Sequence, residues 1–127
     1  MKYLFDNCIS WKFAAMLAAL DRDVTAERRV LPEDATDYAI FDYLKSSGSV
    51  LVTLDTSQTT RAGEAKALKE SGATALFLGP FFGKLGFWKQ AEWIVRRWPL
   101  IDGFATGAEK GTCAEIKQNG KSRLFHL

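Results

Sequence analysis

Short apolar runs alternate along the chain with longer stretches in which apolar residues recur every three or four positions. Four apolar runs are typical of buried strands: Tyr3–Phe5, Val24–Glu27, Val50–Asp55 and Ala75–Leu78. Four stretches have the spacing of amphipathic helices: Ile9–Leu20, 36–47, Arg61–Ser71 and Phe87–Trp98. This alternation predicts an α/β fold with a mostly parallel central sheet and helices on both of its faces.

Capping and turn residues set the expected boundaries. Thr36 is expected to cap the second helix and Gly48 to close it, while Pro99 is expected to end the fourth helix. Glycine-rich loops are expected at 81–86 and 103–111. Asn119-Gly120 predicts a small C-terminal hairpin between the segments Thr112–Lys117 and Ser122–Phe125.

Length and composition narrow the class of protein. A chain of 127 residues is expected to form one domain over residues 1–127, and no run is long enough to cross a membrane. His126 is the one histidine, and the two cysteines, Cys8 and Cys113, stand far apart. These counts exclude zinc ribbons and histidine-rich zinc hydrolases, and they leave carboxylates, lysines or hydroxyls for any catalysis. Free cysteines without a leader segment predict the cytoplasm.

Charge is divided unevenly between the two halves of the chain. Residues 1–63 hold 7 basic and 9 acidic residues, whereas residues 64–127 hold 10 basic and 6 acidic residues. The acidic half suggests a cation site, and the basic half suggests contact with phosphate. Arg61 opens the helix after Asp55, so it is expected near the same site, where a guanidinium suits a phosphate group.

Three aspartates are expected at one edge of the sheet. Asp6 ends the first strand and Asp55 ends the third, and the carboxyl ends of parallel strands share one edge. Asp37 opens the second helix, which runs antiparallel to the strand of Asp55, so it reaches the same edge. Converging carboxylates repel one another unless a cation lies among them, and oxygen ligands alone favour Mg²⁺ or Mn²⁺.

Each aspartate also has a plain structural explanation. Asp37 fits the favourable charge at a helix N-terminus, Asp6 with Asn7 fits turn chemistry, and Asp55-Thr56-Ser57 fits an ordinary loop after a strand. Phe87 and Trp88 are expected to pack against the sheet, and Cys8 to pack as a small apolar residue on the first helix.

Three motifs in order resemble the compact PIN-like nucleases. They are the strand end Leu4-Phe5-Asp6-Asn7, the helix start Thr36-Asp37, and the strand Val50-Leu51-Val52-Thr53-Leu54-Asp55. The segment 61–72 and the later Trp88 and Trp98-Pro99 are similar to the toxin-like branch, which is associated with type II toxin–antitoxin pairs. The resemblance covers about residues 1–100.

The resemblance implies a PIN-like three-layer α/β/α fold and a metal-dependent endoribonuclease. It implies that Asp6, Asp37 and Asp55 hold Mg²⁺ or Mn²⁺ and that Thr53 orients a ligand or water. Many relatives carry carboxylates where Asn7 and Ser57 stand here. Asn7 still offers a carbonyl oxygen and Ser57 a hydroxyl, but the smaller charge predicts weaker metal binding.

The resemblance also implies partners, namely an RNA substrate and a cognate antitoxin protein. The oligomeric state stays open, with a homodimer among the alternatives, and no membrane partner is expected. Two other functions are alternatives to the metal-dependent endoribonuclease. One is a catalytically weak or inactive PIN-like module that binds RNA or protein, and the other is a flavodoxin-like receiver or small-ligand domain. Receivers normally carry an acidic pair after the first strand and a lysine after a late strand, whereas the first strand here is followed by Asp6-Asn7.

Overall fold

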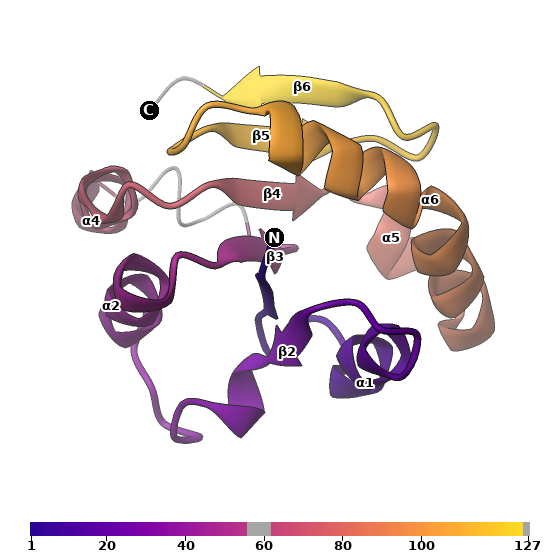
Figure 1. The fold of residues 1–127 in the computed structure, drawn as a ribbon, viewed down its shortest axis with the longest axis horizontal. Helices are drawn as coiled ribbons and strands as arrows, with labels where there is room; N and C mark the ends of the chain where they lie inside the picture. The colour runs from indigo at the N-terminus through magenta and orange to yellow at the C-terminus, as the bar shows by residue number, and fades with distance from the viewer. Residues whose placement is uncertain (56–61, 126–127) are drawn as a thin grey trace.

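A six-stranded sheet runs through the centre of the molecule, with helices on both faces (Figure 1). The computed structural model describes residues 1–55 and 62–125, with residues 62–64 as backbone only. The strand order is β2-β1-β3-β4-β5-β6. β1 to β5 pair in parallel, and β6 pairs antiparallel with β5. The α/β class and the mostly parallel sheet are therefore confirmed.

The strands are short, and the helices differ widely in length. The strands are β1 (Tyr3–Phe5), β2 (Val24–Ala26), β3 (Val50–Thr53), β4 (Ala75–Leu78), β5 (Cys113–Ile116) and β6 (Ser122–Phe125). The helices are α1 (Trp11–Ala19), α2 (Asp37–Ser47), α4 (Ala62–Ser71), α5 (Phe81–Lys84) and α6 (Phe87–Gly107), with a 3₁₀ turn η1 (Glu27–Arg29) after β2.

Alternation along the buried strands divides the core into two layers. On one face Tyr3, Phe5 and Val52 pack with residues of α1 and α6. On the other face Leu4 and Leu51 pack with residues of α2 and α4. Figure 1 shows α1 and α6 on one side of the sheet and α2 and α4 on the other. These two layers and the sheet form the expected α/β/α arrangement.

The expected caps of α2 are confirmed. The Thr36 hydroxyl accepts a hydrogen bond from the Ala39 amide at 3.2 Å, and Gly48 closes the helix in the left-handed region at φ +70°. The α2 helix therefore begins at Asp37, which fixes this carboxylate at the helix N-terminus.

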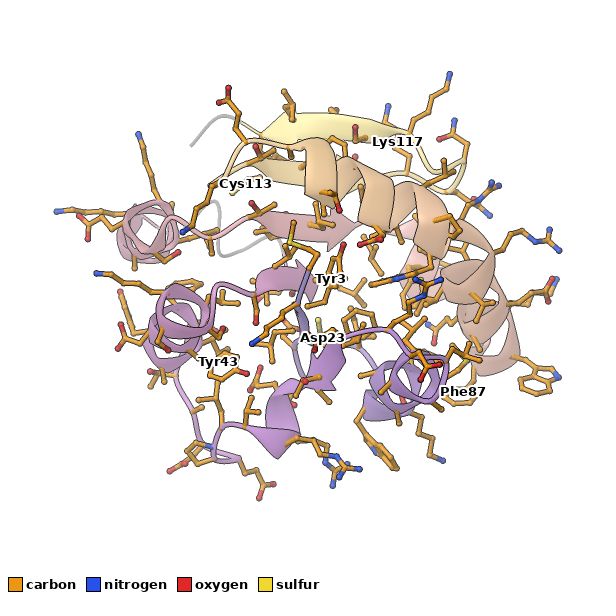
Figure 2. All side chains as sticks on the ribbon, in the orientation of Figure 1. Tyr3, Asp23, Tyr43, Phe87, Cys113 and Lys117 are labelled. Carbon is orange, nitrogen blue, oxygen red and sulfur yellow. The ribbon has the colours of Figure 1, made fainter. Side chains whose placement is uncertain are left out.

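Three expectations about the C-terminal third are wrong. A short helix, α5, forms within the expected loop 81–86. The helix α6 continues through Pro99, which was expected to end it, and its last turns occupy residues 103–107 of the expected loop 103–111. The Tyr3 hydroxyl donates to Asp102 at 2.5 Å, so the part of α6 beyond Pro99 is tied to the first strand. Figure 2 shows the side chain of Tyr3 near the centre of the molecule.

Candidate functional site

Asp6 lies buried at the carboxyl end of β1. Its residue is only 5% exposed. One carboxylate oxygen accepts hydrogen bonds from the amide and the thiol of Cys8, and the other accepts from the hydroxyl of Thr53. Burial raises the pKa of Asp6, the charge of Asp55 raises it further, and the bonds from Cys8 and Thr53 oppose the rise. Asp6 therefore joins the loop after β1 to the neighbouring strand β3.

Cys8 belongs to this site, and the expectation that it packs as a small apolar residue on the first helix is wrong. It lies in the loop before α1, which begins at Trp11. Its thiol donates to Asp6, and its sulfur accepts from the Leu54 amide at 3.1 Å. Shielding from water and the charge of Asp6 raise the pKa of Cys8 to about 12. The thiol is therefore protonated at neutral pH and acts as a hydrogen-bond donor.

Asp55 and Thr53 come from the end of β3, beside β1. The Thr53 hydroxyl is fully buried, and it accepts from the Asp55 amide at 3.0 Å while it donates to Asp6. Asp55 is half-buried, and its charge acts on Asp6. The structure therefore brings Asp6, Asp55 and Thr53 together at the predicted edge.

Glu27 is a site residue that the sequence analysis missed. It directly follows β2, it is 4% exposed, and its two oxygens accept from the side chain of Asn7 at 2.8 Å and the amide of Asn7 at 3.4 Å. Burial and then the charges of Asp6 and Asp37 raise the pKa of Glu27, while the amide of Asn7 lowers it. The rule that selected Asp6 and Asp55, a carboxylate at the end of a strand, applies equally to Glu27.

Asp37 reaches the same end of the sheet from α2. It is half-buried, and its charge is felt at Glu27. The four carboxylates thus form a chain of electrostatic neighbours, in which Asp55 acts on Asp6, and Asp6 and Asp37 act on Glu27. Ser57, Arg61 and His126 lie outside the described residues.

The donor chemistry of this edge fits a hard divalent cation only in part. Its carboxylate oxygens suit Mg²⁺ or Mn²⁺, and their mutual repulsion would fall if a cation were bound. Within residues 1–55 and 62–125, however, no three His, Cys, Asp or Glu side chains lie close enough to bind one metal ion. Mg²⁺ is often held by one or two carboxylates with water and phosphate as the other ligands. Asp6 and Asp55 fit that smaller requirement.

A hollow of about 520 Å³ opens beside Asn7. Its lining residues are Asn7, Ile9, Ser10, Trp11, Arg28 and Glu33. Because Asn7 also donates to Glu27, this residue connects the hollow with one of the site carboxylates. A ligand in the hollow would therefore lie against Asn7, the hydrogen-bond partner of Glu27.

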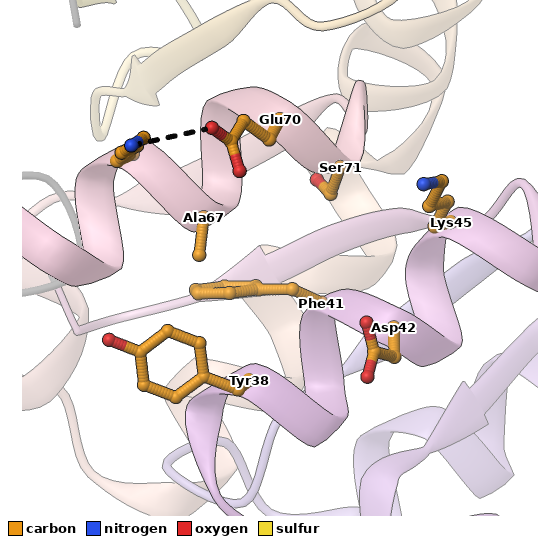
Figure 3. A pocket seen from close by; sticks show the side chains of 8 residues that line it. Tyr38, Phe41, Asp42, Lys45, Ala67, Glu70 and Ser71 are labelled. Atoms are coloured by element: carbon orange, nitrogen blue, oxygen red, sulfur yellow. Dashed lines mark ion pairs between the residues drawn. The ribbon is translucent and has the colours of Figure 1, made fainter.

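A second hollow, of about 440 Å³, lies between α2 and α4 (Figure 3). Tyr38 and Phe41 of α2 face Ala67 of α4, and Lys66 pairs with Glu70 at 3.9 Å on the α4 side. No described residue of the predicted site lines this hollow. The candidate chemistry therefore lies at the sheet edge and not between these helices.

Two aromatic side chains depart from their expected positions. Trp88 is 83% exposed and Phe87 is 51% exposed, although both were expected to pack against the sheet. Phe87 stacks on Phe13 of α1, with ring centroids 4.9 Å apart, at the outer end of α6 (Figure 2). Trp93 and Trp98 fill the core instead.

The sequence of residues 1–80 matches a protein family described as PIN like domain. The matched segment covers more than half of the chain and contains Asp6, Asp37 and Asp55. The chain belongs to the PIN-like domain family. Comparison of this PIN-like protein with curated proteins and with solved structures finds no match.

The length and apolar character of the helices bear on whether this PIN-like protein could cross a membrane. In the described part of the chain, none is both long enough and apolar enough to cross a bilayer. The longest helix, α6, carries charged residues along its exposed side, including Lys89, Glu92 and Arg96.

Proposed function

We propose that this PIN-like protein is an endoribonuclease that hydrolyses RNA phosphodiester bonds with Mg²⁺ or Mn²⁺. The observation that carries the proposal is the pair of carboxylates at neighbouring strand ends, where burial and then the charge of Asp55 raise the pKa of Asp6. Such a pair gains stability when a cation neutralises it, and family membership is consistent with a nuclease.

The residues of the chain have distinct parts in this proposal. Asp6 and Asp55 hold the metal, and Asp37 adds its charge from the start of α2, where it acts on Glu27. When bound, the metal supplies a Lewis acid that polarises the phosphate and lowers the pKa of its water. Thr53 and Cys8 fix the orientation of the Asp6 carboxylate through their hydrogen bonds, and Asn7 does the same for Glu27. Ser57 and Arg61 are assigned supporting and phosphate-binding roles on the sequence alone.

The biological role follows from the toxin-like resemblance. We propose that the protein acts in the cytoplasm as the toxin of a toxin–antitoxin pair and that an antitoxin protein covers the site. Expression should then arrest growth, and the product of a neighbouring small gene should relieve the arrest. Growth that is unaffected by expression of an active nuclease would contradict the toxin role and leave the enzyme assignment in place.

A direct cleavage assay tests the enzyme assignment. Purified protein should cleave single-stranded RNA with Mn²⁺ and should stop when EDTA is added. Asp6→Asn and Asp55→Asn should each lower the rate by about 100-fold or more, because each removes a carboxylate from the metal site. Asp42→Asn is the matched control, since Asp42 is exposed on α2 and away from the strand ends. Cleavage that persists in both site variants would contradict the assignment of Asp6 and Asp55 to the metal site.

One observation favours a second candidate, a PIN-like module that binds RNA or protein without cleaving it. Both oxygens of Asp6 already accept hydrogen bonds from the chain, as do both oxygens of Glu27. Such a site is satisfied without a metal ion. Binding of RNA in EDTA, combined with no cleavage in Mn²⁺ or Mg²⁺, would select this candidate over the nuclease.

A further inference from the structure

The hollow beside Asn7 has an aromatic wall that is surrounded by cations. Trp11, the first residue of α1, is 37% exposed and contributes its indole to the lining. The guanidinium of Arg28 lies 5.1 Å from the ring centroid, and Arg29 and the Lys12 ammonium each lie 5.9 Å from a ring centroid of the same indole. These cation–π contacts hold the indole in place and gather three positive charges at one exposed ring.

The turn η1 connects this ring to the carboxylates. Its first residue, Glu27, is buried and bonded to Asn7, whereas Arg28 and Arg29 are exposed and lie over Trp11. One turn of chain therefore has an anionic inner side and a cationic outer side. Asn7 links the two sides, because its side chain donates to Glu27 and the residue also lines the hollow.

This combination selects the chemistry of a ligand. A flat ring can stack on the exposed indole, and an anionic group can bind the guanidinium groups beside it. Glu33, at the rim, is the one acidic residue in the lining, so the lining and the two further cations at the indole are positive overall. Each nucleotide carries both a flat ring and an anionic phosphate. The acidic residues of a peptide carry the negative charge without a ring.

We propose that the hollow bounded by Trp11 and Arg28 is a nucleotide subsite for single-stranded RNA, with a base stacked on Trp11 and the adjoining phosphates on Arg28 and Arg29. The proposal rests on the proposed RNA substrate, because Asn7, which lines the hollow, directly follows the proposed metal ligand Asp6 and bonds to Glu27. It assigns a place for the nucleotide next to the scissile bond. It also explains why an exposed tryptophan is fixed by cations at the edge of the site.

Binding measured without cleavage tests the subsite. A fluorescein-labelled single-stranded RNA of about ten nucleotides is titrated with the full chain in EDTA, and fluorescence anisotropy gives the dissociation constant. Trp11→Ala should weaken binding about tenfold, which is typical for the loss of one stacked base, and Trp11→Phe should restore most of it. Trp88→Ala is the matched control, because Trp88 is 83% exposed on α6 and contributes nothing to this hollow.

The salt dependence gives a second measurement that does not need the indole to be removed. Arg28→Gln should reduce the slope of log Kd against log salt concentration by about one, as expected for one lost phosphate contact. Arg28 is exposed, so this variant should fold normally, which circular dichroism checks. An unchanged slope, or a Trp11→Ala affinity equal to that of Trp88→Ala, would overturn the subsite.

The two proposals fail in different ways. If the wild-type chain cleaves RNA but binds it equally well without Trp11, the subsite is wrong and the nuclease stands. If the chain binds RNA through Trp11 and Arg28 but never cleaves it with Mn²⁺, the nuclease is wrong and the subsite stands. Absence of any RNA binding overturns the subsite.

Discussion

Asp6 is subject to two opposing demands. Burial favours its neutral form, whereas holding a cation requires the charged form. The hydrogen bonds from Cys8 and Thr53 favour the charged carboxylate, while the charge of Asp55 opposes it. The fold therefore keeps a carboxylate that costs stability at neutral pH, and such a cost is common where a residue serves a site.

The first prediction concerns this cost. Because the pKa of Asp6 is raised in the folded protein, stability falls as the pH rises from the ordinary carboxyl range through the raised value. Asn at this position keeps the shape and one acceptor oxygen but does not titrate. Asp6→Asn should therefore melt at a higher temperature than wild type at pH 8, and the difference should shrink towards pH 4.

Thermal melts followed by circular dichroism between pH 4 and pH 8 check this prediction. The groups facing Asp6 are Cys8, Thr53 and Asp55, and Glu27 lies nearby. Asp42→Asn, at an exposed position of α2, should show no such trend. A constant difference across the pH range, or a less stable Asp6→Asn protein at pH 8, would contradict the raised pKa.

Single residues could be predicted from the sequence where their position in an element decided their place. Asp6 and Asp55 were found because strand ends in a parallel sheet share an edge. Glu27 meets the same rule, since it ends the predicted strand Val24–Glu27, but the sequence does not show that this strand lies beside β1. The hydrogen bonds of Cys8 to Asp6 and Leu54 depend on the path of the loop after β1, which residue types alone do not determine.

Among the elements, α6 departs most from the sequence expectation. Proline lacks the amide that bonds to the residue four positions earlier, so Pro99 was expected to end this helix. Yet Ala91, Ile94, Trp98, Ile101 and Ala105 are all buried. Their spacing of three and four residues continues unbroken across Pro99, and packing of this stripe on the sheet outweighs the lost bond. The same stripe is present in the sequence, where it continues past Pro99.

The second prediction follows from this helix. Pro99 is exposed, so Pro99→Ala removes no buried contact, and it restores one helical hydrogen bond and relieves the clash with the preceding turn. The gain within the helix is about 3 kcal/mol, and the greater freedom of the unfolded chain offsets about 1 kcal/mol of it. Urea denaturation should therefore show a protein that is about 1–2 kcal/mol more stable.

A matched variant separates the proline effect from ordinary helix propensity. Lys89→Ala, exposed on the same helix before Pro99, should change the free energy of unfolding by less than about 0.5 kcal/mol. A Pro99→Ala protein no more stable than Lys89→Ala would mean that the helix already compensates for the proline.

At the scale of the whole molecule, the sheet depends on the segment beyond the family match. Residues 81–127 supply α6 and the β5–β6 hairpin, and β5 pairs in parallel with β4. The Asn119-Gly120 turn predicted the hairpin correctly, and Gly120 has φ +86°. The sequence did not show that β5 extends the parallel sheet, because pairing between distant segments is set by the whole fold and not by local residue types.

The third prediction is that residues 1–80 do not fold alone, although they contain the family match and every predicted site residue. In the full chain, Phe5, Val52 and Leu76 are buried in one core layer together with Trp93, Ile94 and Trp98 of α6. Removing residues 81–127 exposes that layer and the edge of β4, and each large apolar side chain returned to water loses about 1.5–3 kcal/mol. Since domains of this size are stable by only about 5–15 kcal/mol, the loss of several such contacts is comparable with the total stability. The amide NMR spectrum of residues 1–80 should be poorly dispersed, whereas a chain ending at Phe125, the last residue of β6, should give the dispersed spectrum of the full protein. A dispersed spectrum from residues 1–80 would show instead that α2, α4 and the first four strands form a stable unit without α6.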